Sequence, residues 1–472
     1  MPNRLRLIPF REEPSIRCVV VVDGEHYPPV VRDAVAELRA SGTDVLAAIL
    51  AGGREKLPAA GSVSYGPFEV RAGDDPRSML DDALVELAPD VVIDLADEPV
   101  LDYRMRHELV CVSLFRGVPY QGPGFGFEPP PRPSLCAHPS LAIIGTGKRT
   151  GKTAVAGAAA RHLAASGFKP VVVAMGRGGP PDPEVVRGDE ISLTPRALMA
   201  IADEGRHAAS DYIEDALLAR VPTVGCRRCG GGLAGSVETS NVADGIAVAN
   251  ELPGDLLILE GSGSAIPPAR ADVTGLVVPA TISEEHLRGY FGLYRVLLAD
   301  FVVVTMCEYP FGSPSQVSAT TSRLRDAWRP GGRSGRSGSE LRVVRTVFRP
   351  TPTGPVDGAT AYVATTAPEP AGESIRRHLE GEHGCRVVGI SHSLSNRGRL
   401  EDELRVLTTG VDVLLCEIKG AGVDVATRTA LDAGIEVIYM DNAVVGVEGD
   451  EVTEVFERAA GLAAARYDGT RR

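Results

Sequence analysis

One glycine-rich segment carries the clearest chemistry in this sequence. It reads Gly145-Thr-Gly-Lys-Arg-Thr-Gly-Lys-Thr153, follows an apolar run at 141–144 and opens a helical pattern over 153–165. Glycines let backbone N–H groups turn toward phosphate oxygens, and the N-terminus of the following helix adds positive potential. Lys152 would reach the β- and γ-phosphates of a nucleotide, and the Thr153 hydroxyl would bind Mg²⁺. The segment therefore predicts a P-loop for ATP.

The spacing of this loop differs from the standard pattern. Thr146 stands five residues before Gly151, and glycines stand on either side of it. A plain glycine-rich turn is the alternative, but a strand, Gly-Lys-Thr and a helix in this order favour nucleotide binding. The residues that we expect to contact ATP are Gly145, Thr146, Gly147, Lys148, Arg149, Thr150, Gly151, Lys152 and Thr153. We expect Lys148 and Lys152 to act in catalysis, although Lys148 or Arg149 could equally be a solvated loop charge.

A carboxylate at the end of a second strand could complete a metal site. The segment Asp255-Leu-Leu-Ile-Leu-Glu260-Gly-Ser-Gly263 places Glu260 after a buried apolar run. Ligands of parallel sheets gather at the carboxyl ends of strands. An acidic residue after an apolar strand is common. It indicates a metal site here only because a P-loop accompanies it. We expect Glu260 to act in catalysis and to hold Mg²⁺ with Thr153, directly or through water.

Several cations between these two elements could bind a second anion. Arg177 lies in Met175-Gly-Arg-Gly-Gly-Pro180, directly after a predicted strand, and two arginines lie in Gly225-Cys-Arg-Arg-Cys-Gly-Gly-Gly232. Guanidinium groups bind phosphate through two parallel hydrogen bonds, and glycines permit close backbone approach. Surface charges are the alternative. The residues that we expect to bind an anionic substrate are Arg149, Arg177, Arg227, Arg228 and His207.

Two further patterns in this middle region have competing interpretations. The segment Gly205–Asp215 looks helical, and a helix would bring His207, Asp211, Glu214 and Asp215 onto one face. That face could be merely solvated. Cys226 and Cys229 could hold zinc, but zinc needs four ligands and no second pair is nearby in the sequence.

The outer parts of the chain carry weaker signals. Asp23-Gly-Glu-His-Tyr27, Ser391-His-Ser-Leu-Ser-Asn-Arg397 and Cys416-Glu-Ile-Lys419 each follow a predicted strand. Each could line a cleft, and each could be an ordinary loop. Lysine is rare, with five lysines against 44 arginines, so a retained lysine such as Lys419 can mark a place that needs a compact charge.

Short apolar runs separated by helical lengths recur along the whole chain. A helical pattern covers Pro29–Ala40. Runs of this kind are typical of parallel strands covered on both faces, so the predicted class is α/β with a P-loop nucleoside triphosphatase-like parallel sheet core and flanking α/β parts. The runs lie at 18–22, 45–50, 91–95, 141–144, 171–174, 256–259, 301–304, 361–364, 387–390, 413–415 and 437–439.

Two breaks in composition divide the 472 residues into three parts. The breaks are the proline-rich Phe127–Pro133 and the Gly, Ser and Arg segment Gly331–Ser339. We expect residues 1–135 to form an N-terminal α/β domain with an assembly or lid role. We expect 136–330 to form the P-loop core, and 340–472 to form a C-terminal α/β part that could be continuous with it.

Composition excludes several classes of function. The formal charge of −13 argues against a general nucleic-acid coat, which would need the opposite field. No window of about 20 apolar residues exists, so we expect no membrane span. The first 17 residues lack the apolar run of a signal peptide, and the eight scattered cysteines read as reduced thiols, so we expect a cytoplasmic protein.

Together these motifs resemble the cyclic 2,3-diphosphoglycerate synthetase family over nearly the whole length. The resemblance implies ATP- and Mg²⁺-dependent closure of 2,3-diphosphoglycerate into a cyclic phosphoanhydride, with release of ADP and phosphate, in a cytoplasmic homodimer. The segments that carry it are Asp23–Pro29, Gly145–Thr153, His207–Asp211, Gly225–Gly232, Ser240–Val242 and Glu260–Gly263.

Two other functions remain open from the sequence. The Glu260-Gly-Ser-Gly263 turn is also similar to dethiobiotin synthetase, so another P-loop ligase or kinase of that group is one alternative. A nucleotide-switched interaction ATPase is the other, because that class often carries a lysine early in its loop. Lys148 is near that place but offset from it. The arginine-rich middle and the large flanking parts favour a small-molecule substrate.

Overall fold

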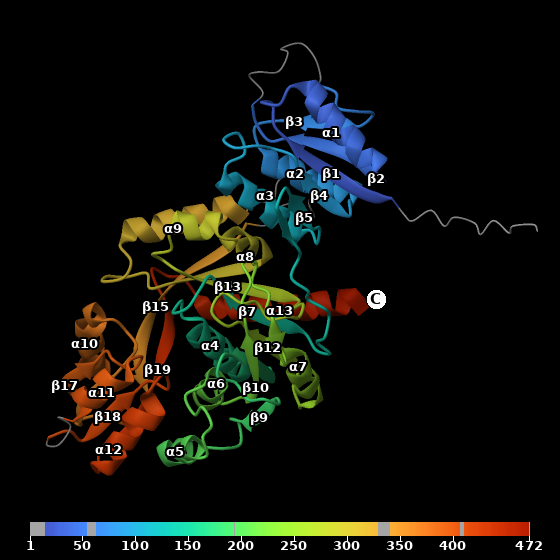
Figure 1. Cartoon of the computed structure of the whole chain (residues 1–472). Coiled ribbons are helices and arrows are strands. Elements are labelled where there is room, and N and C mark those ends of the chain that lie inside the picture. The colour runs from blue at the N-terminus through green and yellow to red at the C-terminus, as the bar shows by residue number, and fades with distance from the viewer. Residues whose placement is uncertain (1–14, 54–62, 193, 329–339, 406–409, 472) are drawn as a thin grey trace, which may run out of the picture. The chain divides into compact units, whose positions relative to one another are not determined.

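The computed structural model describes residues 15–53, 63–192, 194–328, 340–405 and 410–471. The chain divides into two compact units, both of which alternate strands and helices (Figure 1). Unit 1 contains the described residues up to Pro129 and Arg288–Leu297, and unit 2 contains most of the rest. The predicted α/β class is confirmed. The predicted break at 331–339 lies outside the described residues.

Unit 1 is built on a six-stranded sheet in the order β3-β2-β1-β4-β5-β6. All neighbouring strands are parallel except β5 and β6, which are antiparallel. The strands are β1 (Ile16–Val22), β2 (Thr43–Leu50), β3 (Glu69–Ala72), β4 (Val91–Asp94), β5 (Tyr120–Gly122) and β6 (Phe125–Phe127). The helices are α1 (Pro28–Ala40), α2 (Pro76–Leu87), α3 (Tyr103–Phe115) and α8 (Gly292–Leu298).

The core of unit 1 explains why these elements form. Residues 18–22 of β1 are all buried, as a strand covered on both faces requires. The returning segment that contains Arg288 and Phe291 packs into the same unit. The Arg288 guanidinium lies 2.7 Å from a carboxylate oxygen of buried Glu108, and the Phe291 ring lies 5.0 Å from the Phe127 ring. Unit 1 is therefore made from stretches that lie far apart in the sequence.

Unit 2 contains a larger sheet, in the order β11-β10-β8-β12-β7-β13-β14-β15-β19-β18-β16-β17, with β9 beside β10. The run from β10 to β15 is parallel. These strands are β7 (Ser140–Gly145), β8 (Pro170–Gly176), β9 (Glu184–Arg187), β10 (Pro222–Cys229), β11 (Thr239–Ser240), β12 (Leu256–Glu260), β13 (Val273–Pro279), β14 (Phe301–Thr305) and β15 (Arg342–Pro352).

The C-terminal strands continue this sheet. They are β16 (Thr360–Ala364), β17 (Arg386–Ser391), β18 (Val413–Cys416) and β19 (Glu436–Gly446). The first residues of β19 pair in parallel with β18, and its second half pairs antiparallel with β15. The predicted short strand at 437–439 is thus the start of a long one. Because β15 and β19 are both long, they join the C-terminal strands to the P-loop strands within one unit.

Helices cover the sheet of unit 2. They are α4 (Lys152–Ala165), α5 (Pro195–Asp203), α6 (Asp211–Ala219), α7 (Val242–Glu251), α9 (Pro314–Trp328), α10 (Gly372–His383), α11 (Arg397–Leu404), α12 (Arg428–Asp432) and α13 (Val452–Arg471). Short helical turns lie at 285–289, 369–371 and 422–427. Across the described part of the chain, no helix combines the length and the apolar character that crossing a membrane requires.

The predicted helix over Gly205–Asp215 is wrong. Helix α5 ends at Asp203, and α6 begins only at Asp211. Gly205 has a φ of 77°, a left-handed conformation that ends helices, and Ser210 takes the extended N-cap conformation before α6. His207 therefore lies in the connecting turn and does not share a helical face with the acids of α6.

Leu163 tests the packing of α4 on the sheet. Its side chain is fully buried, so we expect Leu163→Ala to lower the free energy of unfolding by about 2–5 kcal/mol, because the truncation leaves a cavity. Urea denaturation measures this. Leu462→Ala on α13 is the matched control, because Leu462 is 40% exposed and should change the free energy little. Equal losses for both variants would contradict the packing described here.

Candidate active site

The P-loop connects β7 to α4 at the carboxyl edge of the sheet, and two of its glycines are required by packing. Gly151 has a φ of 90°, and a Cβ atom there would lie 2.2 Å from the Cζ atom of Phe348 in β15. A Cβ atom on Gly145 would lie 2.6 Å from Cδ of Lys152. No larger residue fits these places without displacing Phe348 or Lys152.

Lys152 is the buried cation of this loop. Its side chain folds back so that Nζ donates a hydrogen bond to the Gly147 carbonyl oxygen over 3.2 Å. Burial lowers the pKa of Lys152, and the negative charges of Glu260 and Asp211 oppose that effect. The ammonium group thus lies inside the loop, where the phosphates of a nucleotide would bind.

The other polar residues of the loop differ in exposure. Thr150 is buried, and its carbonyl oxygen accepts a 2.8 Å hydrogen bond from the hydroxyl of Thr305 on β14. Lys148 and Arg149 are exposed. The Arg149 guanidinium donates to the hydroxyl of Ser395, over 3.3 Å, whereas Lys148 has no side-chain hydrogen bond or ion pair with any described residue. Lys148 is therefore available to a ligand.

Glu260 lies beside the P-loop, as the sequence predicts. Strand β12 pairs in parallel with β7 and places Glu260 opposite Ile143, at the edge where the P-loop begins. The Glu260 carboxylate hydrogen-bonds the Thr153 side chain and the Asp215 carboxyl group. Burial raises the pKa of Glu260 to about 7 and raises that of Asp215 well above its usual range. A proton on Asp215 would form the hydrogen bond that joins the two carboxyl groups.

This arrangement fits a bound Mg²⁺. Thr153 and Glu260, the two predicted metal ligands, are in hydrogen-bond contact. The Oε2 atom of Glu260 and the Oδ2 atom of Asp215 are both buried, and neither accepts a hydrogen bond from an N–H group or a hydroxyl of another described residue. A hydroxyl and a carboxylate are oxygen ligands of the kind that Mg²⁺ prefers beside nucleotide phosphates. Asp215 was not predicted to act here, and its only sequence signal was its place on the acidic helix.

Two arginines converge on the turn that follows Glu260. A Cβ atom built on Gly263 would lie 3.5 Å from Nη2 of Arg228 and 3.8 Å from Nη2 of Arg177. Burial, together with the charge of Arg177, lowers the pKa of Arg228. Arg228 donates to the carbonyls of Gly230 and Ser262, but its buried Nε–H has no acceptor among the described residues. This pair of like charges favours an anion between them.

The segment Ser240–Val242 positions the Arg177 loop. The Asn241 side chain accepts a 2.7 Å hydrogen bond from the Arg227 backbone N–H and donates to the carbonyls of Pro180 and Pro181 over 3.2 and 3.0 Å. Asn241 thereby ties the end of β10 to the loop that carries Arg177. This role went unpredicted, because nothing in the sequence links Asn241 to residues 60 positions earlier.

Arg227 and Arg228 do not point the same way. Both lie within β10, where successive side chains point to opposite faces. Arg228 turns toward Ser262, whereas Arg227 is exposed and has no side-chain hydrogen bond or ion pair with a described residue. The same alternation separates Cys226, which is buried, from Cys229, which is exposed. The four residues therefore do not act as one cluster.

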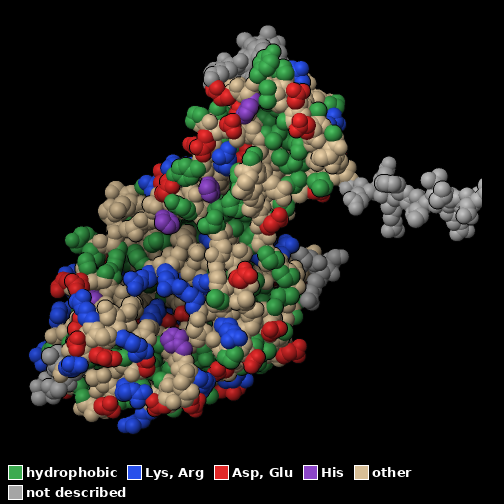
Figure 2. Space-filling model, in the orientation of Figure 1, with side chains coloured by type: hydrophobic (Ala, Val, Ile, Leu, Met, Phe, Trp, Pro, Cys, Tyr) green, Lys and Arg blue, Asp and Glu red, His purple; other side chains and the backbone are tan. Residues whose placement is uncertain are grey.

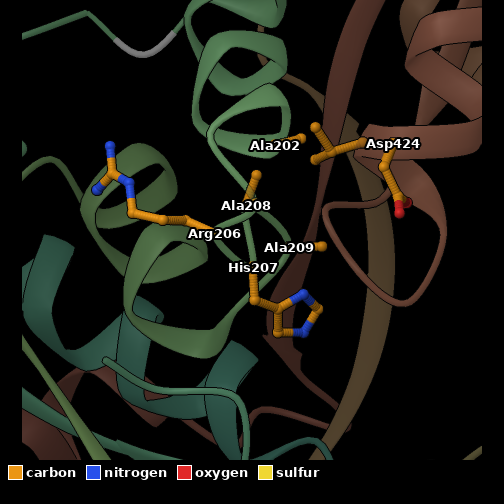
Figure 3. Close-up of a pocket in the computed structure, with 8 residues that line it drawn as sticks. Ala202, Arg206, His207, Ala208, Ala209 and Asp424 are labelled. Atoms are coloured by element: carbon orange, nitrogen blue, oxygen red, sulfur yellow. The ribbon is translucent and has the colours of Figure 1, made fainter. Parts of the chain in front are cut away.

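His207 lines a cavity next to the Arg177 loop. A Cβ atom on Gly178 would lie 2.3 Å from Cδ2 of His207, so the ring packs against that loop. The cavity measures about 340 Å³, and His207 and Arg206 extend in different directions around it (Figure 3). Arg206 is held by Glu184 and Glu204. The lining residues are Ala202, Gly205, Arg206, His207, Ala208, Ala209, Val423 and Asp424.

The C-terminal strands bring one more cation to this region. Lys419, in the loop after β18, has its Nζ atom 3.3 Å from Oε1 of Glu214 on α6. Burial raises the pKa of Glu214, and the positive charge of Lys419 opposes this effect. Figure 2 shows Lys and Arg side chains gathered around a hollow on the face of unit 2 that is in view.

Fold and site together define a nucleotide-binding protein of the P-loop class. Family models for cyclic 2,3-diphosphoglycerate synthetase match three stretches of the chain. The N-terminal domain model matches residues 17–128, the P-loop domain model matches 140–327, and the C-terminal domain model matches 352–443.

Relatives named cyclic 2,3-diphosphoglycerate synthetase match nearly the full length. The one from Methanothermobacter thermautotrophicus is 43% identical over 455 residues, which cover 93% of this chain and 96% of the relative. The one from Rubrobacter xylanophilus is 43% identical over 94% of this chain and 98% of its own. The chain therefore belongs to the cyclic 2,3-diphosphoglycerate synthetase family and is an enzyme, as its motifs predict.

Similarity to solved structures is much lower. LpxK from Aquifex aeolicus, solved in complex with ATP, aligns with a TM-score of 0.39 and 13% identity over 70% of this chain and 90% of that one. This similarity is too low to support an inference about the function of this protein.

Removing the P-loop ammonium should strongly weaken nucleotide binding. We expect Lys152→Ala to weaken the binding of Mg-ATP by at least about 100-fold, because a charge-assisted contact to phosphate is lost in a buried site. Isothermal titration calorimetry measures this. Lys169→Ala is the control, because Lys169 is exposed and precedes β8 at the opposite edge of the sheet. Unchanged affinity in Lys152→Ala would contradict the assignment of the loop.

The raised pKa of Glu260 should make metal binding sensitive to pH. A carboxyl with a pKa of about 7 loses its charge as the pH falls below 7, so the Mg²⁺-dependent part of ADP binding should weaken by up to about tenfold from pH 8 to pH 6. Calorimetry with and without Mg²⁺ measures that part. Glu260→Gln should lack this component while keeping the titration of the nucleotide itself. Identical pH profiles for the two proteins would exclude Glu260 as the titrating ligand.

Proposed function

We propose that this protein uses ATP to close 2,3-diphosphoglycerate into cyclic 2,3-diphosphoglycerate, with release of ADP and phosphate. The observation that carries the proposal is the convergence of Arg177 and Arg228 on Gly263, next to a P-loop and a metal-binding pair. The names of the relatives support the substrate. A protein that only switches between nucleotide states would not need a second group of cations at the edge of the sheet where the P-loop lies.

Each part of the site has a role in this proposal. The loop residues Gly145–Thr153 bind ATP, and Lys152 holds its β- and γ-phosphates. Thr153 and Glu260 would hold Mg²⁺, which supplies positive charge to the phosphates when bound. Asp215 is a positioning residue, because it orients Glu260 through a hydrogen bond. Lys148 lies exposed on the same loop and would contact the γ-phosphate during transfer.

The reaction proceeds in two displacements. An oxygen of one substrate phosphate attacks the γ-phosphorus of ATP, so a new P–O–P bond forms and ADP leaves. An oxygen of the second substrate phosphate then attacks the phosphorus that carries the transferred group. Phosphate leaves with the former γ-phosphorus, and the ring closes through a phosphoanhydride. The protein contributes mostly positioning and charge stabilisation.

The substrate needs many cations because it carries two phosphates and a carboxylate. Bringing two phosphates together is repulsive, and fixed guanidinium groups offset that repulsion. Arg177 and Arg228 would bind the substrate directly. Arg149 and His207 would complete its binding from the P-loop and the turn before α6, whereas Arg227, which points to the other face of β10 from Arg228, would not.

Several features of the whole molecule belong to the same proposal. The protein would act as a cytoplasmic homodimer on this small acid, without nucleic acid or membrane as a partner. Residues 1–135 would have an assembly or lid role, residues 136–330 would form the P-loop core, and residues 340–472 would continue that core. A different ligase or kinase of the dethiobiotin synthetase-like group would share the P-loop but would not select 2,3-diphosphoglycerate.

Phosphorus NMR tests the proposal directly. We expect protein, Mg-ATP and 2,3-diphosphoglycerate to yield the cyclic product, one ADP and one phosphate. We expect Arg177→Gln to raise the KM for the acid by about 10-fold or more, because one charge-assisted contact is lost, while ATP binding stays nearly unchanged. Arg377→Gln is the control, because Arg377 is exposed on α10. Absence of the cyclic product at high enzyme concentration would refute the substrate.

A further inference from the structure

Lys419 brings a charge from the C-terminal strands to the P-loop. Its ammonium group pairs with Glu214 over 3.3 Å, and α6, which carries Glu214, also carries Asp215, the partner of Glu260. The positive charge of Lys419 also acts on Lys152. Burial lowers the pKa of Lys152, and repulsion from Lys419 lowers it further. The ammonium of Lys419 therefore belongs to the same electrostatic cluster as the P-loop lysine.

The loop that carries Lys419 is firmly held. The carboxylate of Glu417, two residues earlier, accepts hydrogen bonds from the Thr365 hydroxyl at 2.7 Å and the Asn442 amide at 3.1 Å. The N–H and hydroxyl of Thr366 donate to its other oxygen over 2.9 and 2.6 Å. On the other side, a Cβ atom on Gly420 would lie only 2.3 Å from the Leu394 carbonyl oxygen. These contacts fix the position of the backbone at Lys419.

The ammonium group is charged and still accessible. Burial alone would lower the pKa of Lys419, but Glu214 and Glu417 outweigh burial and raise it. The Lys419 side chain is 31% exposed, whereas that of Glu214 is 8% exposed. An ammonium has three N–H donors, and Glu214 engages only one side of it. The remaining donors can meet a ligand that enters beside the P-loop.

We propose that Lys419 contacts the phosphoryl group that passes between ATP and the substrate acid, so that the C-terminal strands supply a catalytic residue to the P-loop site. In the transition state of such a reaction the transferred group carries negative charge spread over its three equatorial oxygens, and a fixed cation stabilises that charge without reorganisation. Glu214 is then a positioning residue that aims Lys419. This inference rests on the proposed function, because it assumes phosphoryl transfer to a second molecule.

A purely structural ion pair is the competing explanation, and a pair of variants separates the two. Removing one partner of a buried pair leaves an uncompensated charge, whereas replacing both partners by neutral groups is often harmless to stability. We therefore compare Lys419→Met with the double variant Lys419→Met/Glu214→Gln. The double variant also keeps the test possible if Lys419→Met alone fails to fold.

The expected result is a loss of kcat that the double variant does not recover. Steady-state ADP release should show kcat at least about 100-fold below that of the original protein in both variants, with the dissociation constant for ATP changed by less than about threefold. The double variant should unfold at the original temperature. Lys169→Met, at an exposed lysine remote from the site, should leave kcat unchanged. A folded double variant with kcat within about threefold of the original overturns the proposal.

Parallel phosphorus NMR separates this inference from the proposed function. If the original protein releases ADP with 2,3-diphosphoglycerate but forms no cyclic product, the proposed product is refuted. The role of Lys419 is then judged on ADP release alone. If the original protein releases no ADP with this acid, both proposals are overturned.

Discussion

The burial of several carboxylates beside a phosphate-binding loop is the constraint that organises this molecule. Glu260, Asp215 and Glu214 are all nearly inaccessible to water, and each would be costly as an isolated charge. The raised pKa of Asp215 favours its neutral form, Glu260 accepts hydrogen bonds from its neighbours, and Glu214 pairs with Lys419. One oxygen of Glu260 and one of Asp215 accept no hydrogen bond from an N–H group or a hydroxyl of another described residue, and a metal ion bound by Glu260 would supply positive charge there.

The order of the strands is what brings these groups together. Because β7 lies between β12 and β13, the P-loop and the acid at the end of β12 meet at one edge of the sheet. Strands β15 and β19 are long enough to pair with the P-loop strands at one end and with the C-terminal strands at the other. The loop after β18 therefore reaches the site from more than 250 residues away in the sequence.

The anion-binding side depends on backbone contacts as much as on charge. Asn241 binds the end of β10 to the loop that carries Arg177, and the Ser262 carbonyl holds Arg228. Two guanidinium groups near the same glycine repel each other until an anion lies between them, so their positions must be fixed by other bonds. A substrate with several negative charges suits such a place, which is why the geometry and the family membership support the same reaction.

The α/β class, the P-loop and Glu260 were readable from the sequence because each depends on neighbouring residues. A glycine-rich turn between a strand and a helix predicts a phosphate-binding loop, and an acid that ends an apolar run predicts a carboxylate at the end of a strand. Neither prediction depends on residues far away in the sequence. Only tertiary structure decided four features of the site: the contact of Asp215 with Glu260, the hydrogen bonds of Asn241, the divergence of Arg227 from Arg228, and the pairing of Lys419 with Glu214. Local spacing even misled at His207, where Gly205 and Ser210 end one helix and begin the next. Side-chain charges interact through space. Their separation along the sequence therefore does not predict which of them lie together at the edge of the sheet beside the P-loop.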